Sequence, residues 1–173
     1  MSKYRWLVFY TRPRSEKKAE LRLLDQGMEV LVPKCEEIRQ WSDRKKKVIV
    51  PLFRGYLFAS VDERSRIQVL QTPEIVCDVK FSGQPAELRE EEVENLRIIQ
   101  DKPDLLEAES TTLPQVGEKV IVEEGPFKGL TGEVVDHNNI THILVRIEAI
   151  GQAAKVNIPG SAVKVIDSRA KSG

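Results

Sequence analysis

The sequence predicts an α+β protein with an N-terminal α/β sandwich, in which helices flank an antiparallel sheet, and a small C-terminal β-barrel. Residues 1–102 alternate strand-like apolar runs with segments of helical periodicity, whereas residues 115–168 carry short strand patterns separated by glycine turns. Between them, residues 103–114 are rich in acids, hydroxyl side chains and proline. We therefore expect domains at 1–102 and 115–168, joined by a linker at 103–114.

The N-terminal part begins with an apolar and aromatic run at residues 6–10, which predicts a central strand covered on both faces. Trp6 is expected in the core. Strong helix formers occupy residues 15–26, and Gly27 is placed to end that helix. The remaining pattern predicts a hairpin within 30–50, strands at 53–61 and 75–81, a short helix at 66–71 and an amphipathic helix at 87–100.

The C-terminal part has only strand patterns. Its valine, isoleucine, threonine and glycine content favours strands over a helical hairpin. Several short strands in so few residues are typical of a small closed barrel. We expect strands at 119–122, 132–135, 143–147, 155–158 and 163–166.

Charge is balanced over the chain, with 27 basic and 27 acidic residues, but it is unevenly distributed. Lys34 to Arg54 holds seven basic side chains against three acidic ones, and Glu87 to Glu109 holds nine acidic against three basic. Cys35 and Cys77 lack the spacing of a zinc site or a disulfide framework. Because the first residues contain no signal or membrane-spanning run, we expect a cytoplasmic monomer without a membrane partner.

The histidines and acidic clusters of the chain do not support catalysis. His137 and His142 are predicted to face different directions, and no serine or cysteine pattern accompanies them. The acidic run from Glu90 to Glu94 spreads around a predicted helix, which favours a solvated face over a metal site. The sequence therefore predicts a protein that is not an enzyme and that holds no cofactor or metal.

The most specific motif lies near the start of the barrel. Gly125 and Pro126 predict a tight turn, and Phe127 is placed to fill the barrel. Gly129 and Gly132 permit a positive φ where a strand bends. This spacing resembles the KOW motif of SH3-like barrels. Since KOW modules bind either RNA or proteins, the motif indicates an architecture before a function.

With this motif, the chain resembles the NusG family of transcription elongation factors over nearly its whole length, from Tyr4 to Ile166. The matching segments include Arg5-Trp6-Leu7-Val8 and Phe53-Arg54-Gly55-Tyr56-Leu57-Phe58. The resemblance implies a non-enzymatic elongation or antitermination factor. It also implies that the N-terminal domain docks on the clamp helices of the largest RNA polymerase subunit through an apolar, aromatic depression.

The resemblance assigns this polymerase contact to Phe53, Arg54 and Tyr56. Arg54 stands where the family has a proline. An exposed aromatic ring supplies a large contact area at a small entropic cost, as the centre of an interface requires. The alternative is that these rings belong to the core, and we favour the interface for Tyr56.

The predicted hairpin has a basic tip. Four consecutive cations repel one another unless a polyanion neutralises them, and the nearby tryptophan offers a face on which an unpaired base can stack. Polar side chains at the tip are also able to reach base edges. A solvated loop is the alternative. The predicted nucleic-acid-binding residues are Arg39, Gln40, Trp41, Ser42, Arg44, Lys45, Lys46 and Lys47.

The stretch from Glu37 to Lys47 is similar to that of the UpxY-type paralogues of Bacteroidetes, which are associated with capsular polysaccharide operons. Like RfaH, such a paralogue would read the exposed non-template DNA strand at a particular operon. Two alternatives stay open. One is a housekeeping NusG-type factor that acts genome-wide, and the other is a ribosome-associated or RNA-binding KOW protein.

On the barrel, the family presents a partner-binding loop with an exposed apolar residue followed by glycine and often arginine. Ile150 and Gly151 keep the first two features, and Gln152 replaces the cation. The resemblance implies termination factor Rho or the ribosome as the partner, and the lost charge argues against Rho. Ordinary barrel packing of Ile150 is the alternative.

Overall fold

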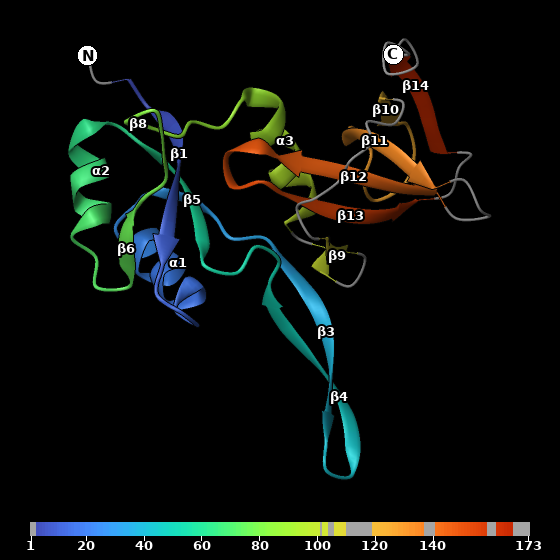
Figure 1. The fold of residues 1–173 in the computed structure, drawn as a ribbon, viewed down its shortest axis with the longest axis horizontal. Helices are drawn as coiled ribbons and strands as arrows, with labels where there is room; N and C mark the ends of the chain where they lie inside the picture. The colour runs from blue at the N-terminus through green and yellow to red at the C-terminus, as the bar shows by residue number, and fades with distance from the viewer. Residues whose placement is uncertain are drawn as a thin grey trace.

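The computed structural model describes residues 3–100, 102–103, 106–109, 119–136, 141–158 and 162–167. Figure 1 shows two lobes, the N-terminal sheet with its helices and the barrel, with helix α3 between them. The N-terminal sheet is antiparallel, and its strand order is β2 (Glu29–Leu31), β5 (Tyr56–Val61), β1 (Arg5–Thr11) and β6 (Ile75–Asp78). The α+β class predicted from the sequence is confirmed.

Alternation along β1 divides the N-terminal lobe into two cores. Leu7 and Phe9 face one side, where they pack with side chains of α1 (Glu16–Asp25) and α2 (Glu63–Leu70). Val8 faces the other side, toward α3 (Glu90–Ile99). The sheet is therefore covered on both faces, as the continuous apolar run predicts.

The predicted hairpin is confirmed as a two-stranded ribbon of β3 (Lys34–Trp41) and β4 (Arg44–Pro51), which projects away from both lobes (Figure 1). In the structure only Ser42 and Asp43 form the turn, because cross-strand pairing extends to Trp41 and Arg44. A second, much shorter hairpin joins β7 (Lys80–Phe81) to β8 (Gln84–Pro85).

The barrel lobe is one antiparallel sheet with the order β14-β10-β11-β12-β13-β9. All five predicted barrel strands are present, and the short 3₁₀ turn η2 (Glu148–Ile150) precedes β13. The bounds are β10 Lys119–Val122, β11 Thr131–Asp136, β12 Thr141–Ile147, β13 Gln152–Ile158 and β14 Val163–Asp167.

The sixth strand of that sheet, β9 (Leu106–Glu109), comes from the segment predicted to be a linker without packed residues. That expectation is wrong for Leu106, whose side chain is only 3% exposed. The sequence looked too sparsely apolar to pack, but one leucine is enough where a core is already present to receive it. Residues 104–105 and 110–114 lie outside the described residues, and the proposed division at 103–114 stays a prediction.

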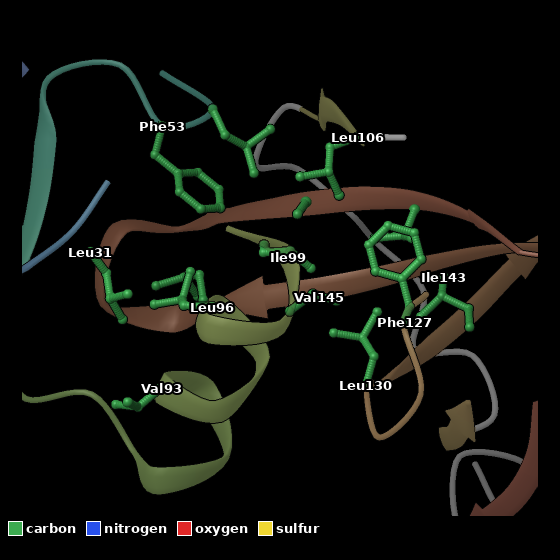
Figure 2. Packing of buried hydrophobic residues seen from close by; sticks show 14 of the residues in the cluster. Leu31, Phe53, Val93, Leu96, Ile99, Leu106, Phe127, Leu130, Ile143 and Val145 are labelled. Carbon is green, nitrogen blue, oxygen red and sulfur yellow. The ribbon is translucent and has the colours of Figure 1, made fainter. Parts of the chain in front are cut away.

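The two lobes share one buried apolar cluster, which we call the seam (Figure 2). Helix α3 supplies Leu96 and Ile99, and the barrel supplies Phe127 from the segment predicted to be a KOW motif. Trp6 was expected in this core but is only partly buried at its edge, with the Arg97 guanidinium 5.5 Å from the ring centroid. The seam side chains labelled in Figure 2 are Leu31, Phe53, Val93, Leu96, Ile99, Leu106, Phe127, Leu130, Ile143 and Val145.

The segment predicted to be a KOW motif folds largely as its glycines predict. Gly125 and Gly129 have φ values of +90° and +95°, and Phe127 is buried. Gly132 does not have a positive φ and serves another purpose. A Cβ atom there would lie 2.6 Å from the carbonyl oxygen of Leu144, so glycine allows β11 and β12 to approach closely.

Candidate functional site

The segment predicted to contact polymerase forms a tight turn. The Tyr56 amide donates to the Phe53 carbonyl oxygen at 3.2 Å, and Gly55 has a φ of +85°. These features match a type II turn, in which proline is favoured at the second position and glycine at the third. Arg54 occupies the second position, is exposed and pairs with Glu37 of β3 at 2.9 Å. The turn thus forms without the proline.

A buried carboxylate fixes this turn to helix α1. The Gly55 amide donates to Glu16 Oε2 at 2.9 Å, and Thr11 donates its amide to the Gly55 carbonyl at 2.8 Å. Glu16 is buried, yet it gains a hydrogen bond that partly offsets its desolvation. Sequence analysis missed this role, because nothing in the pattern near residue 16 points to a glycine 39 residues away.

An aromatic pair lies beside the turn. Tyr56 and Tyr10 are opposite each other in the β5–β1 register, and their ring centroids are 5.1 Å apart. Tyr10 is 38% exposed, and Tyr56 is partly buried. Partial burial, together with the neighbouring Tyr10, raises the pKa of Tyr56. Cys77 of β6, next in register to Tyr10, is exposed, so the three residues form a strip across the sheet that we call the tyrosine strip.

Phe53 has a different environment from Tyr56. Its side chain is only 2% exposed and meets Phe58 edge-on, with centroids 6.1 Å apart. Figure 2 shows Phe53 directed into the seam near α3 and Leu106. The two predicted aromatic contacts therefore differ in exposure. Tyr56 is partly exposed at the edge of the seam cluster, and Phe53 is covered in this arrangement of the lobes.

Polar contacts also hold the seam closed. The Asn95 side chain of α3 donates to the Thr131 carbonyl and accepts from the Thr131 amide, both at 3.0 Å. Glu92 Oε2 accepts the amide of Glu148 at 3.1 Å. Asn95 and Glu92 are both buried, so their polar atoms need partners: Asn95 finds them at Thr131 across the seam, whereas Glu92 Oε1 also accepts from Arg89 in its own lobe.

The predicted partner loop of the barrel adjoins the same seam. Ile150 ends η2 and is partly buried against the seam cluster. Gly151 follows with a φ of +62°, a conformation that suits glycine. Gln152 then begins β13. The Glu148 amide of the same η2 turn donates a hydrogen bond to Glu92 of α3, and this contact holds the loop close to the N-terminal lobe.

All eight predicted nucleic-acid-binding residues are exposed on the outer part of the β3–β4 ribbon. Residues opposite each other in an antiparallel pair share a face. One face therefore carries the pairs Arg39 with Lys46 and Trp41 with Arg44. Trp41 is 51% exposed, and the Lys46 ammonium lies 5.4 Å from its ring centroid. This face joins an aromatic surface to three cations.

The opposite face of the ribbon pairs Gln40 with Lys45 and Ile38 with Lys47. Ile38 is 64% exposed. Within the described part of the chain, no ion pair is recorded for the lysines at 45–47, whereas Arg39 is paired with Glu37 at 3.3 Å. The sequence correctly indicated a basic tip, but it could not divide the residues between two faces before the register was known.

The described residues do not form a metal-binding group of three or more His, Cys, Asp or Glu side chains. Within the same ranges, no helix has the length and apolar character needed to cross a bilayer. His137, which the sequence gave no catalytic role, lies outside the described residues. The tyrosine strip, the basic ribbon and the predicted partner loop are the features that correspond to the sites predicted from the sequence.

Comparison with known families gives a consistent assignment. A family model described as "Transcription termination factor nusG" matches residues 4–97. The chain is 26% identical to the transcription termination/antitermination protein NusG of Rickettsia bellii, covering 94% of this chain and 90% of the relative. It is 28% identical to the corresponding Staphylococcus epidermidis protein, covering 75% of this chain and 78% of the relative.

The fold is also similar to that of a solved protein. The structure described as "Domain interaction in Thermotoga maritima NusG" superimposes with a TM-score of 0.52 at 21% identity, covering 95% of this chain and 98% of that one. The similarity extends across both lobes, so the architecture as a whole has a precedent.

Proposed function

The chain belongs to the NusG family of transcription termination and antitermination factors, and we propose that it binds the clamp helices of RNA polymerase through the tyrosine strip and Phe53. The observation that supports this proposal is the pair of exposed Tyr10 and partly buried Tyr56 beside a turn fixed to α1. Paired rings on a rigid sheet can bury a large apolar area with little loss of conformational entropy. Arg54 stands at the rim of this surface.

Phe53 can join this contact only after the barrel lobe moves. Its ring lies within the seam, and the partner loop at Ile150 adjoins the same cluster. Separation of the lobes would expose Phe53 to the polymerase and the partner loop to the ribosome or Rho. Polymerase binding would then shift the population from the closed to the open arrangement, with no covalent step.

The polymerase contact is tested by binding of the full chain to an isolated clamp-helix fragment. We expect Tyr56→Ala and Tyr10→Ala to weaken binding about 30-fold or more, the loss typical of a central aromatic side chain. Tyr4→Ala is the matched control, since Tyr4 is exposed at the opposite end of β1. Equal binding by all four proteins would exclude the tyrosine strip as the contact.

We propose further that the basic ribbon binds the exposed non-template DNA strand. The cations at 44–47 would neutralise phosphates, while the exposed ring of Trp41 would stack on an unpaired base. Arg39, Gln40 and Ser42 are exposed where they could reach base edges. Binding to a DNA bubble should fall about tenfold in Trp41→Ala, since one base–aromatic stack contributes about 1–3 kcal/mol. Unchanged bubble binding would exclude this role.

The similarity of residues 37–47 to UpxY-type paralogues supports an operon-specific antitermination factor of capsular polysaccharide genes. Chromatin immunoprecipitation across the genome provides the test. Signal confined to one operon is the expected result. Signal over most transcribed genes would instead assign a housekeeping NusG-type role.

A ribosome-associated or RNA-binding role is the second candidate, and the observation that favours it is that the basic ribbon is exposed even with the lobes closed. Structured RNA and a single-stranded DNA bubble should be compared in filter binding with the same protein. Preference for the bubble supports the transcription role. Preference for RNA, lost when Lys45, Lys46 and Lys47 are replaced, would favour the second candidate.

A further inference from the structure

Strand β9 occupies a position in the barrel that a segment of another protein could fill. It pairs antiparallel with β13, with Leu106 opposite Val156 and Glu109 opposite Ala153. On its other side, β13 is paired with β12. If β9 leaves, β13 becomes an outer strand whose backbone amides and carbonyls on that side are available for a new strand.

Two observations indicate that β9 stays paired with β13 only while the lobes are closed. Its four residues, Leu-Glu-Ala-Glu, include three of types that are depleted in strands, so its intrinsic preference for pairing is small. Its buried anchor is Leu106, which packs in the seam with Phe53 and Ile99 (Figure 2). The N-terminal lobe therefore contributes to the burial of Leu106, and separation of the lobes would expose part of this side chain.

We propose that the outer edge of β13 is a strand-addition site for an extended segment of a partner protein, and that β9 occupies this site while the lobes are closed. In strand addition, main-chain hydrogen bonds supply affinity and side-chain pockets supply specificity. The seated strand indicates the chemistry of the partner. An aliphatic residue takes the position of Leu106, and an acidic residue takes that of Glu107, which lies opposite Lys155 in the register.

Separation of the two lobes and release of β9 from β13 are expected to be coupled. Because Leu106 and Phe53 share the seam, an event that exposes Phe53 also uncovers the anchor of β9. This link rests on the proposed polymerase contact, but the existence of the strand-addition site does not. A tethered strand competes at an effective concentration of about millimolar, so a free segment binds poorly until β9 is released.

The test uses the full chain and a fluorescent peptide of residues 102–112 added in trans. Leu106→Asp removes the apolar anchor, and Ala108→Pro introduces a residue that strands tolerate poorly while Leu106 stays in place. Both variants should bind the peptide at least about tenfold more tightly than the wild-type chain, which keeps its own β9 in place. Hydrogen exchange of β13 amides should be faster in both variants and slow again when the peptide is bound.

A peptide with proline at the position of Ala108 is the matched control and should bind neither variant. The proposal is overturned if folded variants fail to bind the peptide, or if the proline peptide binds equally well. Dimerisation of the variants in sedimentation would assign the edge to a second copy of this chain and would also overturn it. No clamp fragment enters this assay, so its outcome is independent of the polymerase proposal.

Discussion

The basic ribbon and the aromatic turn are neighbours in the sequence but differ in exposure. The ribbon ends at Pro51, and Phe53 begins the turn two residues later. The ribbon extends into solvent with all its predicted contact residues exposed, whereas the Phe53 ring is covered by the seam. Charged strands can remain solvated when no partner is bound. Burial of an apolar ring, in contrast, removes it from water and so stabilises the closed arrangement.

This difference has a functional consequence. The proposed nucleic-acid surface is available in the closed arrangement, while the proposed polymerase surface is divided between the partly exposed tyrosine strip and the covered Phe53. Contact with DNA would then need no movement of the lobes, whereas full contact with polymerase would. Opening of the seam becomes the step at which recruitment can be controlled.

Of the substitutions that test the contrast between turn and ribbon, Phe53→Ala should change stability the most. Removing a buried phenylalanine leaves a cavity and should lower the free energy of unfolding by about 3–5 kcal/mol. Trp41→Ala, at the exposed tip, should change it by less than about 0.5 kcal/mol. Urea unfolding of both variants measures the difference. Similar losses in the two would mean that the ribbon is not an independent, solvated element.

The next largest effect should follow Asn95→Ala. The change leaves the Thr131 amide and carbonyl without their side-chain partner, which disfavours closure by about 1–3 kcal/mol. We expect faster hydrogen exchange at the Thr131 amide and about tenfold tighter binding of the clamp-helix fragment. Glu94→Ala, on the exposed side of the same helix, is the control. Weaker clamp binding by Asn95→Ala would contradict the closed seam as a barrier.

The sequence could predict those features that depend on local pattern. Apolar periodicity located the barrel strands, and glycine spacing located the turn at Gly125. The run of cations located the ribbon tip. Each of these signals lies within a few residues of the structure that it specifies, so no knowledge of the tertiary fold was needed.

Features that depend on distant contacts could not be predicted in the same way. Tyr10 becomes part of a candidate site because its ring lies beside that of Tyr56, and Asn95 because it bonds to Thr131. In both pairs the two residues are far apart in the sequence. Leu106 looked like part of a polar linker, because the core that buries it is assembled from both lobes. Only the register and the packing bring these residues together.

A smaller, graded effect concerns the ribbon lysines. Each phosphate contact with a single strand contributes about 0.7 to the slope of log K against log salt concentration. Replacing Lys45, Lys46 and Lys47 with alanine should therefore reduce the slope for a DNA bubble by about 2. A triple alanine variant at the exposed lysines 80, 128 and 164 is the charge-matched control. Equal reductions in both variants would show that net charge, and not the ribbon, governs binding.

The smallest effect is expected from Arg54→Pro, which restores the family's residue in the turn. Proline fits the second position of a type II turn and lowers the entropy of the unfolded chain, stabilising by up to about 1 kcal/mol. Loss of the largely exposed pair with Glu37 offsets this by about 0–1 kcal/mol. The unfolding midpoint in urea should therefore stay close to that of the wild type.

Gly55→Ala provides the contrast within the same turn. Its φ of +85° strains any other L-residue, so we expect a loss of about 1 kcal/mol or more, although open space surrounds the added Cβ. If Arg54→Pro destabilised the chain as much as Gly55→Ala, the backbone at 54 would not be that of a type II turn. Tyr56 would then owe its position to the sheet register and the Glu16 anchor alone.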